Sequence, residues 1–335
     1  MKQKLGTASY SNIYTEALNM MMDVIKKELK LFGISYDNWF FESSLLAEDQ
    51  ISEAIARLDA CGVLYEKDGA RWFRSTDFGD EKDRVLVRSN RQTTYFAADI
   101  AYHLDKYQKG YDLIVNIWGA DHHGYVARLR AAVSALGLDA DKLHVVLVQF
   151  VNLYEGGQKT AMSTRGGQFI PLSAIRKQIG SDAMHLFYMM RKYTQHIDFD
   201  VELAKSQSND NPLYYLQYAH ARICSVFRQM EEQGYDYSVD TAELGNLDEA
   251  EARALMKSLL RYSSILSLAA ETREPQVLLE YLRELATDFH SYYNRYRFLV
   301  EDEGLRCARL VLAAAVRCIL FNGLTMLGAS APERM

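Results

Sequence analysis

The 335-residue sequence has few cysteines, no excess of basic residues and no long apolar run. Its four cysteines are scattered and form no CxxC pair, which predicts reduced thiols and no zinc site. The formal net charge of −6 argues against a protein that coats nucleic acid through bulk charge. No apolar stretch reaches the ~20 residues of a membrane span, and the first residues do not resemble a signal peptide. We therefore expect a soluble, cytoplasmic protein with no membrane partner.

The rest of the composition is that of a globular protein, with 49% hydrophobic and 24% charged residues. A chain of this length is expected to form about two domains. Clear strand patterns stop at a polar stretch, SQSNDN, which ends at Asn211. We predict an α/β domain over residues 1–206 and a helical bundle over residues 211–335. Helical patterns in the bundle cover residues 214–229, 249–269, 276–299 and 304–327.

The central part of the α/β region predicts a βαβ unit with a right-handed crossover. Residues 112–118 and 144–151 are rich in branched apolar residues, which is typical of buried parallel strands. Residues 125–136 between them have a helical pattern. Nearer the amino terminus, residues 12–31 predict a helix and Asp68-Gly69 predicts a tight hairpin turn.

The segment Gly119-Ala120-Asp121-His122-His123-Gly124 lies where the first of these strands meets the helix. Ligands of open α/β sheets bind at the carboxyl ends of strands, and a helix amino terminus favours anions. Asp121 is suited to accept a hydrogen bond from a ribose hydroxyl, and His122 is suited to reach a phosphate. The alternative is an ordinary strand-to-helix turn with Asp121 as its cap and the histidines exposed.

Two further patterns allow either a functional or an ordinary interpretation. Residues 155–167 contain four glycines, one lysine and one arginine, which predicts a mobile cationic loop for a polyphosphate or else a solvated hairpin loop. Tyr95 and Asp99 are four residues apart, so they share one helical face. A carboxylate beside an aromatic ring suits a guanidinium group. The alternative is a helix cap beside a core tyrosine.

Aromatic residues alternate with arginines in two segments of the predicted bundle, residues 214–222 and 292–297. This pattern suits unstacked RNA bases and phosphates. The alternative is that most of these tyrosines belong to the core, with their hydroxyl groups at its rim.

Taken together, these motifs resemble those of bacterial-type arginyl-tRNA synthetases. The resemblance is carried by GADHHGYVARL, by the MSTR loop, by the block from Asp198 to Ile223 and by the last residues, RLVLAAAVRCILFNGLTMLGASAPERM. It implies the second half of a class I Rossmann-like nucleotide-binding domain, followed by a DALR-type anticodon-binding bundle. It also implies an arginine–tRNA ligase whose partners are arginine, ATP with Mg²⁺, and arginine tRNA.

The resemblance implies a role for particular residues of this sequence. Tyr95 and Asp99 would bind the side chain of the arginine substrate. Gly119, Ala120, Asp121 and His122 would lie against ATP, together with Met162 of the mobile loop. The residues implied in catalysis are Lys159, Met162, Ser163 and Arg165. The residues implied in tRNA binding are Tyr292, Arg295, Tyr296 and Arg297. No resident metal site is implied.

Two departures from the family pattern affect the expected activity. The mobile loop, usually KMSKS, reads AMSTR, so Ala161 and Thr164 replace both lysines. We expect Lys159 or Arg165 to compensate. The class I signature HIGH, or its variant HVGH, does not occur in the sequence. We therefore expect this chain alone to be catalytically inactive.

The absent signature also bears on the partners of the chain. We expect either a missing amino-terminal half or self-association through the sheet edge around Val115 and Val146. The competing interpretation is a non-catalytic tRNA-binding remnant or one subunit of a split gene.

Overall fold

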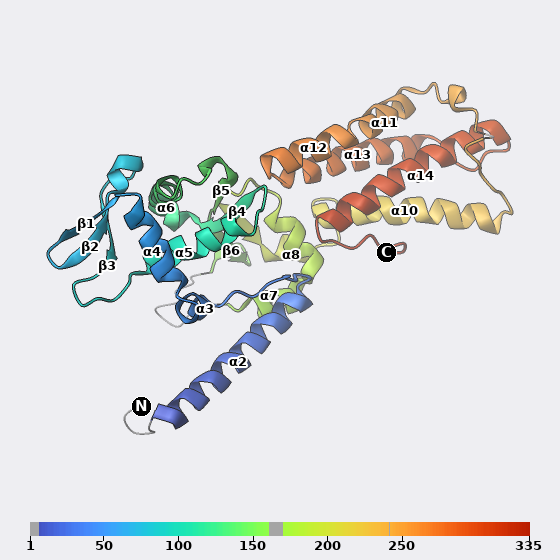
Figure 1. The fold of residues 1–335 in the computed structure, drawn as a ribbon. Helices are drawn as coiled ribbons and strands as arrows, with labels where there is room; N and C mark the ends of the chain where they lie inside the picture. The colour runs from blue at the N-terminus through green and yellow to red at the C-terminus, as the bar shows by residue number, and fades with distance from the viewer. Residues whose placement is uncertain (1–6, 161–169, 241) are drawn as a thin grey trace. The chain divides into compact units, whose positions relative to one another are not determined.

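The computed structural model describes residues 7–160, 170–240 and 242–335 (Figure 1). The chain forms two compact units. The first unit comprises residues 1–35, 151–192 and 196–335. The second unit comprises residues 36–150 and 193–195. The sequence division at residues 206–211 stays a prediction, because the first unit contains residues from both sides of it.

The second unit opens with helices and a small antiparallel sheet that share one core. Its first elements are α3 (Glu42–Ala47), α4 (Gln50–Ala60), β1 (Leu64–Lys67), β2 (Ala70–Phe73), η1 (Ser75–Phe78), β3 (Arg84–Val87) and α5 (Tyr95–Gln108). The sheet order is β1-β2-β3. Asp68 and Gly69 both have positive φ in the two-residue turn between β1 and β2, so the predicted hairpin is confirmed.

The predicted βαβ unit is present in the second unit. It consists of β4 (Ile114–Gly119), η2 (Ala120–His122), α6 (His123–Ala135), η3 (Ala140–Lys142) and β5 (Leu143–Val148). The two strands are parallel, with Ile114 opposite Leu143 and Gly119 opposite Val148. Leu129 and Val133 of α6 pack against Ile114 and Leu143, so this helix covers one face of the strand pair.

The other face of this strand pair is open to solvent within its unit. Ile114 and Asn116 of β4 are buried, but Val115 is 39% exposed and Ile117 is 71% exposed. In the described residues, β4 and β5 form a sheet of two strands. The apolar composition that is typical of buried strands is therefore only partly matched by burial in β4, because the described part of the chain leaves Ile117 largely exposed and Val115 partly exposed.

The predicted strand over residues 144–151 is in fact divided between two sheets. β5 ends at Val148, and β6 (Val151–Glu155) pairs with β8 (Ile197–Asp200) and with β7 (Gln158–Lys159) in the first unit. The backbone N–H of Gln149 donates to the carbonyl of Tyr193 instead of continuing the ladder with β4. A continuous apolar run cannot reveal such a change of partner, because both sheets need apolar residues.

The helix predicted at the amino terminus extends from Thr7 to Leu31 as α2. Its carboxyl end is anchored in the first unit, where Arg176 pairs with Glu28 at 3.3 Å and the Ser181 hydroxyl donates to the Leu31 carbonyl. The apolar side chains of its earlier turns are exposed, among them Ile13, Met20, Met21 and Val24. The apolar stripe that predicted the helix is therefore uncovered by the described residues.

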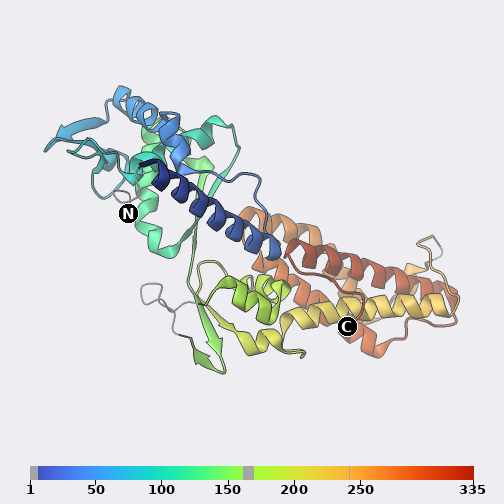
Figure 2. The ribbon, with the colours of Figure 1, turned by 90° about the horizontal axis from the view of Figure 1, so that it is seen from below.

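A bundle of long helices completes the first unit (Figures 1 and 2). The unit contains α7 (Leu172–Ile179), α8 (Ser181–Tyr188), α9 (Val201–Lys205), α10 (Pro212–Glu232), η4 (Leu244–Asn246), α11 (Ala250–Leu260), α12 (Tyr262–Thr272), α13 (Gln276–Arg295) and α14 (Glu303–Met326). Asn211 caps α10 by accepting from the N–H groups of Leu213 and Tyr214, and Pro212 occupies the first helical turn.

Two of the predicted bundle helices differ from the observed ones. The helix expected over residues 249–269 is broken at Arg261 into α11 and α12, and α13 ends at Arg295 rather than at 299. Gly323 lets α14 approach α13 closely, since a Cβ atom there would lie 2.6 Å from Leu282. α10 packs against both α13 and α14, so these three helices surround one continuous apolar core.

Among the described residues, α14 is the one helix long and apolar enough to cross a membrane. Its apolar side chains, including Leu310, Leu312, Val316 and Leu320, are buried in the bundle. The core helix of a soluble protein has this composition as well.

Candidate functional site

The first turn of α5 carries the two residues predicted to bind a guanidinium group. The helix begins at Tyr95 because Thr94 caps it: the Thr94 hydroxyl accepts from the N–H of Ala97 and donates to the carbonyl of Val85 on the β3 side. These two hydrogen bonds hold the start of α5 against the sheet. Asp99 follows one turn later and is half-buried.

The carboxylate of Asp99 is held by a residue that the sequence interpretation did not include. The hydroxyl of Tyr125, on α6, donates a short hydrogen bond to Asp99 Oδ2. Burial, followed by this bond and the negative charge of Asp99, raises the pKa of Tyr125 well above its usual value, so the phenol stays a donor. Because Tyr125 directly follows the 119–124 segment, the bond brings Asp99 close to the start of α6. The one sequence signal for a role of Tyr125 in this site was its position directly after Gly124.

Tyr95 lies on an open surface of the same helix end. Tyr95 is 79% exposed. It borders a cavity of about 420 Å³ whose other lining residues include Glu42, Arg88, Thr93 and Ala98. The ring is therefore available to a planar ligand, while Asp99 offers its charge one turn further along the helix.

The 119–124 segment forms a sharp corner at the carboxyl end of β4. The carboxylate of Asp121 folds back over Gly119, and a Cβ atom at position 119 would lie 2.6 Å from Asp121 Oδ1, so a side chain there would displace this carboxylate. Asp121 and His122 both have exposed side chains, and His122 Nε2 lies 3.8 Å from Asp121 Oδ2. Oxygen acceptors and an imidazole thus face solvent at the strand end, where α/β sheets bind nucleotides.

The predicted catalytic loop is described only in part. Lys159 lies in β7, where it is exposed and pairs with Tyr154 of β6. Met162, Ser163 and Arg165, as well as the substitutions Ala161 and Thr164, lie outside the described residues.

The residues predicted to bind tRNA occupy different environments at the end of α13. Tyr292 is fully buried and packs against Tyr296 and Phe298, so its ring belongs to the core. Arg295 is exposed and forms an ion pair with Glu251, which also accepts from the Tyr296 hydroxyl at 3.1 Å. Arg297 is exposed. An RNA ligand could thus reach Arg295, Tyr296 and Arg297 from solvent, but the ring of Tyr292 faces the interior.

A second cluster in the bundle is centred on Arg222 of α10. Its guanidinium group lies between two aromatic rings, 4.5 Å from the centre of Tyr218 and 4.6 Å from that of Tyr293. It donates to the Tyr218 hydroxyl at 2.7 Å, to His290 Nδ1 at 3.2 Å and to Asn294 Oδ1 at 3.4 Å. The cluster thus fixes one cation and two aromatic rings at one place, and groups of these kinds bind RNA phosphates and unpaired bases.

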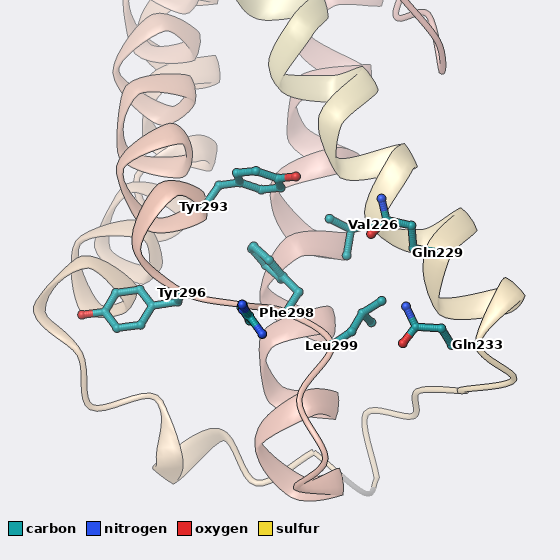
Figure 3. Close-up of a pocket in the computed structure, with 8 residues that line it drawn as sticks. Val226, Gln229, Gln233, Tyr293, Tyr296, Phe298 and Leu299 are labelled. Carbon is teal, nitrogen blue, oxygen red and sulfur yellow. The ribbon is translucent and has the colours of Figure 1, made fainter.

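Two cavities adjoin this cluster, and Tyr293 borders both. One, of about 430 Å³, is lined by Tyr218, Arg222, Arg228, Tyr293 and Arg334, and so gathers three arginines. The other, of about 310 Å³, is lined by Gln229 and Gln233 of α10 and by Tyr293, Tyr296, Arg297 and Phe298 of the facing segment. Figure 3 shows the Tyr293 ring directed toward Val226 of α10. Basic, aromatic and amide groups therefore gather around Tyr293, which borders both cavities.

His290 makes the stability of this cluster dependent on pH. Burial first, and then the positive charge of Arg222, lowers the pKa of His290 from 6.5 to about 4. The folded protein keeps this histidine neutral, so the unfolded chain takes up its proton first as the pH falls from about 6.5 to about 4. We expect this group to reduce the free energy of unfolding by about 2 kcal/mol between pH 7 and pH 5.

Urea unfolding of the wild type and of His290→Gln at the two pH values measures this effect. The variant has no proton to gain and is expected to lose less stability than the wild type. Equal losses in the two proteins would contradict the assignment.

No group of three or more histidine, cysteine, aspartate or glutamate residues is arranged to hold a metal ion in the described part of the chain. Mg²⁺ enters the proposals below only together with ATP, as part of the substrate.

Comparison with known proteins assigns both parts of the chain. Residues 4–207 match the family described as "tRNA synthetases class I (R), catalytic domain", and residues 216–335 match "DALR anticodon binding domain". The arginine–tRNA ligase of Thioalkalivibrio sulfidiphilus is 52% identical over 336 residues, which cover 100% of this chain and 57% of that protein. The ligase of Legionella pneumophila strain Corby is 52% identical over 99% of this chain and 57% of its own length.

Solved structures give the same assignment. A Campylobacter jejuni structure assigned to an arginyl-tRNA synthetase superposes with a TM-score of 0.90 at 32% identity, covering 100% of this chain and 72% of that one. The Thermus thermophilus enzyme shares the fold, with a TM-score of 0.81 at 24% identity over 99% of this chain and 67% of its own.

The chain spans 57% of the length of the curated relatives that it matches. The predicted fold class and the resemblance stated from the sequence are confirmed by these matches. The chain therefore belongs to the arginyl-tRNA synthetase family of class I, with that family's catalytic domain followed by its helical anticodon-binding domain.

Proposed function

We infer that this chain supplies the arginine-binding and tRNA-binding parts of a cytoplasmic arginine–tRNA ligase. The reaction joins the carboxylate of arginine to the AMP part of ATP–Mg²⁺ with release of pyrophosphate. Arginine is then transferred to a hydroxyl group of its tRNA with release of AMP. The observation that carries this proposal is the Asp99–Tyr125 pair beside the 119–124 corner. It puts a fixed carboxylate for a guanidinium group next to a strand end suited to a nucleotide.

In this proposal, Asp99 binds the guanidinium group of arginine. Tyr125 occupies Oδ2 from one side, which leaves Oδ1 and the remaining lone pair of Oδ2 to accept the two parallel N–H groups of the substrate. The exposed ring of Tyr95 covers the planar cation. A lysine substrate is disfavoured because an ammonium group cannot form the planar fork.

The corner at the end of β4 is the proposed site of ATP. Gly119 and Ala120 allow the nucleotide to approach the backbone, Asp121 accepts from a ribose hydroxyl, and exposed His122 lies within reach of a phosphate. Lys159, Met162, Ser163 and Arg165 are proposed to stabilise the departing pyrophosphate. Lys159 or Arg165 would supply the positive charge that Ala161 and Thr164 lack.

The surface of the bundle around Tyr293 is the proposed site of tRNA. Arg222 holds the rings of Tyr218 and Tyr293 together, and this aromatic and cationic cluster is proposed to receive an unstacked base. Arg228 and Arg334 in the same cavity, and Arg295 and Arg297 nearby, are placed to meet phosphates. The resemblance implied tRNA binding by Tyr292, but Tyr292 is buried, so we propose that Tyr293 contacts the tRNA instead.

The catalytic part of this function is tested by arginine-dependent exchange of pyrophosphate into ATP in the presence of tRNA. We expect the 335-residue chain alone to give no exchange, because no HIGH or HVGH sequence is present in it to bind the ATP phosphates. We expect exchange to return when the chain is combined with the part of the Thioalkalivibrio sulfidiphilus ligase that it does not match. Exchange by the chain alone would contradict this proposal.

A substitution on the exposed face of β4 tests, in the same experiment, where the complementing polypeptide packs. Ile117 is 71% exposed on β4, and we propose that the complementing polypeptide covers this face. Ile117→Asp is therefore expected to prevent the recovery of exchange, whereas Leu260→Asp, at an 82% exposed position of α11, is the matched control. If Ile117→Asp recovers fully, the complementing part packs elsewhere.

The alternative function is a tRNA-binding protein without catalysis. The clustered arginines and tyrosines of the bundle favour it, since they would bind RNA whether or not the catalytic domain is complete. This alternative predicts tRNA binding together with no exchange even after complementation, so the same experiment separates the two functions.

A further inference from the structure

A chain of buried polar groups connects α5 with β4 behind the proposed arginine site. His103 of α5 is 4% exposed and Asn116 of β4 is 5% exposed, so both side chains are removed from solvent. They face each other with 2.7 Å between His103 Nε2 and Asn116 Nδ2. Burial of two polar side chains in such contact is costly unless every group is paired.

The direction of each hydrogen bond in this chain is fixed by its first donor. The ammonium group of Lys106 can only donate, and it donates to Asn116 Oδ1 at 3.0 Å. The amide nitrogen of Asn116 must therefore point to His103 and donate to Nε2. The histidine then carries its proton on Nδ1 and donates it to the backbone carbonyl of Asp99, at 2.7 Å.

The surroundings favour this protonation state. Burial, followed by the positive charge of Lys106, lowers the pKa of His103, which keeps the ring neutral. Lys106 and Asp99, both on α5, are the charged groups whose fields act on the ring, and β4 contributes the uncharged Asn116. Lys106 itself is steadied by the ring of Tyr102, 4.1 Å from its ammonium group, and Tyr102 stacks on Phe40 at 4.2 Å.

We propose that Lys106, Asn116 and His103 form a positioning relay that holds α5 in one register on β4 and thereby fixes Asp99 for a guanidinium group. The relay ends on the backbone of Asp99, and Tyr125 holds the side chain of the same residue. It passes through Asn116 of β4, and the 119–124 corner begins three residues further on, at the carboxyl end of that strand. The relay thus sets the spacing between the amino acid site and the nucleotide site.

This inference rests on the proposed function for its ligand, but not for its geometry. A misplacement of about 1 Å between reacting groups typically costs about 100-fold in rate, so a buried connection between the two sites has functional value. None of the three relay residues needs to touch the substrate. They act through Asp99, and their removal is expected to change arginine binding without removing any group that contacts arginine.

Two measurements on the 335-residue chain test the relay. The first is the protonation of His103 by long-range ¹H–¹⁵N correlation of ¹⁵N-histidine-labelled protein, with His103→Gln to assign the signal. We expect the Nδ1–H tautomer in the wild type. In Asn116→Asp, a carboxylate must accept from both neighbours, so His103 is expected to become doubly protonated at neutral pH.

The second measurement is the dissociation constant for L-arginine. Asn116→Leu breaks both bonds of the relay and is expected to weaken binding by roughly 10-fold. In Asn116→Asp both hydrogen bonds can form, but His103 becomes the donor to the carboxylate instead of the acceptor. This variant is expected to bind arginine within about threefold of the wild type. Gln108→Leu makes the same amide-to-leucine change at an exposed position of α5, so it is the matched control and should bind normally.

The outcomes separate this inference from the proposed function. The relay is overturned if His103 has the Nε2–H tautomer in the wild type, or if Asn116→Leu folds and binds arginine as the wild type does. If Asn116→Leu does not fold, the tautomer of the wild type and the change of charge in Asn116→Asp still decide the matter. If the wild type shows the Nδ1–H tautomer but does not bind arginine, the relay stands and the arginine assignment is lost.

Discussion

Replacement of Asp99 by asparagine is expected to weaken L-arginine binding by roughly 100-fold, because truncating one partner of a desolvated charge pair costs about 2–5 kcal/mol. The carboxylate can accept both parallel N–H groups of a guanidinium, whereas an amide has one acceptor oxygen and turns its NH₂ toward another donor. The Tyr125 hydroxyl, which already donates to Asp99, competes for that one oxygen. The substrate cation would then be left without an opposite charge.

A comparison of arginine with citrulline distinguishes this effect from a general loss of folding. Citrulline has nearly the same shape but carries a neutral ureido group, which has an acceptor oxygen where arginine has a donor. The wild type is expected to prefer arginine strongly, and Asp99→Asn is expected to lose most of that preference because its amide can pair with the ureido group. Isothermal titration of both ligands gives the ratio of affinities.

The matched control for this experiment is Asp105→Asn, which removes a carboxylate from the same helix. Asp105 pairs with Lys109 at 2.6 Å and is remote from the Tyr125 contact. It should bind arginine as the wild type does. If Asp99→Asn kept the wild-type preference for arginine over citrulline, Asp99 would not be the residue that recognises the guanidinium group.

The local parts of this site could be predicted from the sequence, but the contact that completes it could not. The spacing of Tyr95 and Asp99 on one helix, and the strand-to-helix corner after Trp118, follow from periodicity and from glycine placement. The Tyr125–Asp99 hydrogen bond joins residues that are 26 positions apart in sequence and lie on two different helices. Such a bond depends on how α5 and α6 pack, and no periodic pattern encodes it.

The bundle shows the same limit for neighbouring residues of one type. Residue type does not distinguish Tyr292 from Tyr293 in the sequence, yet Tyr292 is fully buried and Tyr293 borders two cavities. Successive residues of a helix point about 100° apart, so a shift of one position changes core into surface. The segment around Arg222 was recognised as aromatic and basic, but its clamp with Tyr293 joins residues on different helices and required the packed structure.

Replacement of Arg222 by lysine is expected to weaken binding of the anticodon stem-loop of arginine tRNA by roughly 100-fold. Lysine keeps the charge, but its single nitrogen cannot replace the two guanidinium nitrogens that donate to Tyr218, His290 and Asn294. It also cannot lie flat between the rings of Tyr218 and Tyr293. The loss therefore measures the stacked, planar surface rather than the electrostatic attraction. Base stacking of this kind is worth about 1–3 kcal/mol per base, and the rings lose their common partner as well.

The dependence of this affinity on salt separates base contacts from phosphate contacts. Arg222→Lys is expected to leave the slope of log K against log salt unchanged, since it removes no charge. Arg334→Ala, in the same cavity, should lower that slope by about 1 while weakening binding less. Arg253→Lys, exposed on α11, is the matched control and should have no effect. Wild-type affinity in Arg222→Lys would place the RNA on another face of the bundle, because a planar clamp that contacts a base cannot be replaced by an ammonium group without loss.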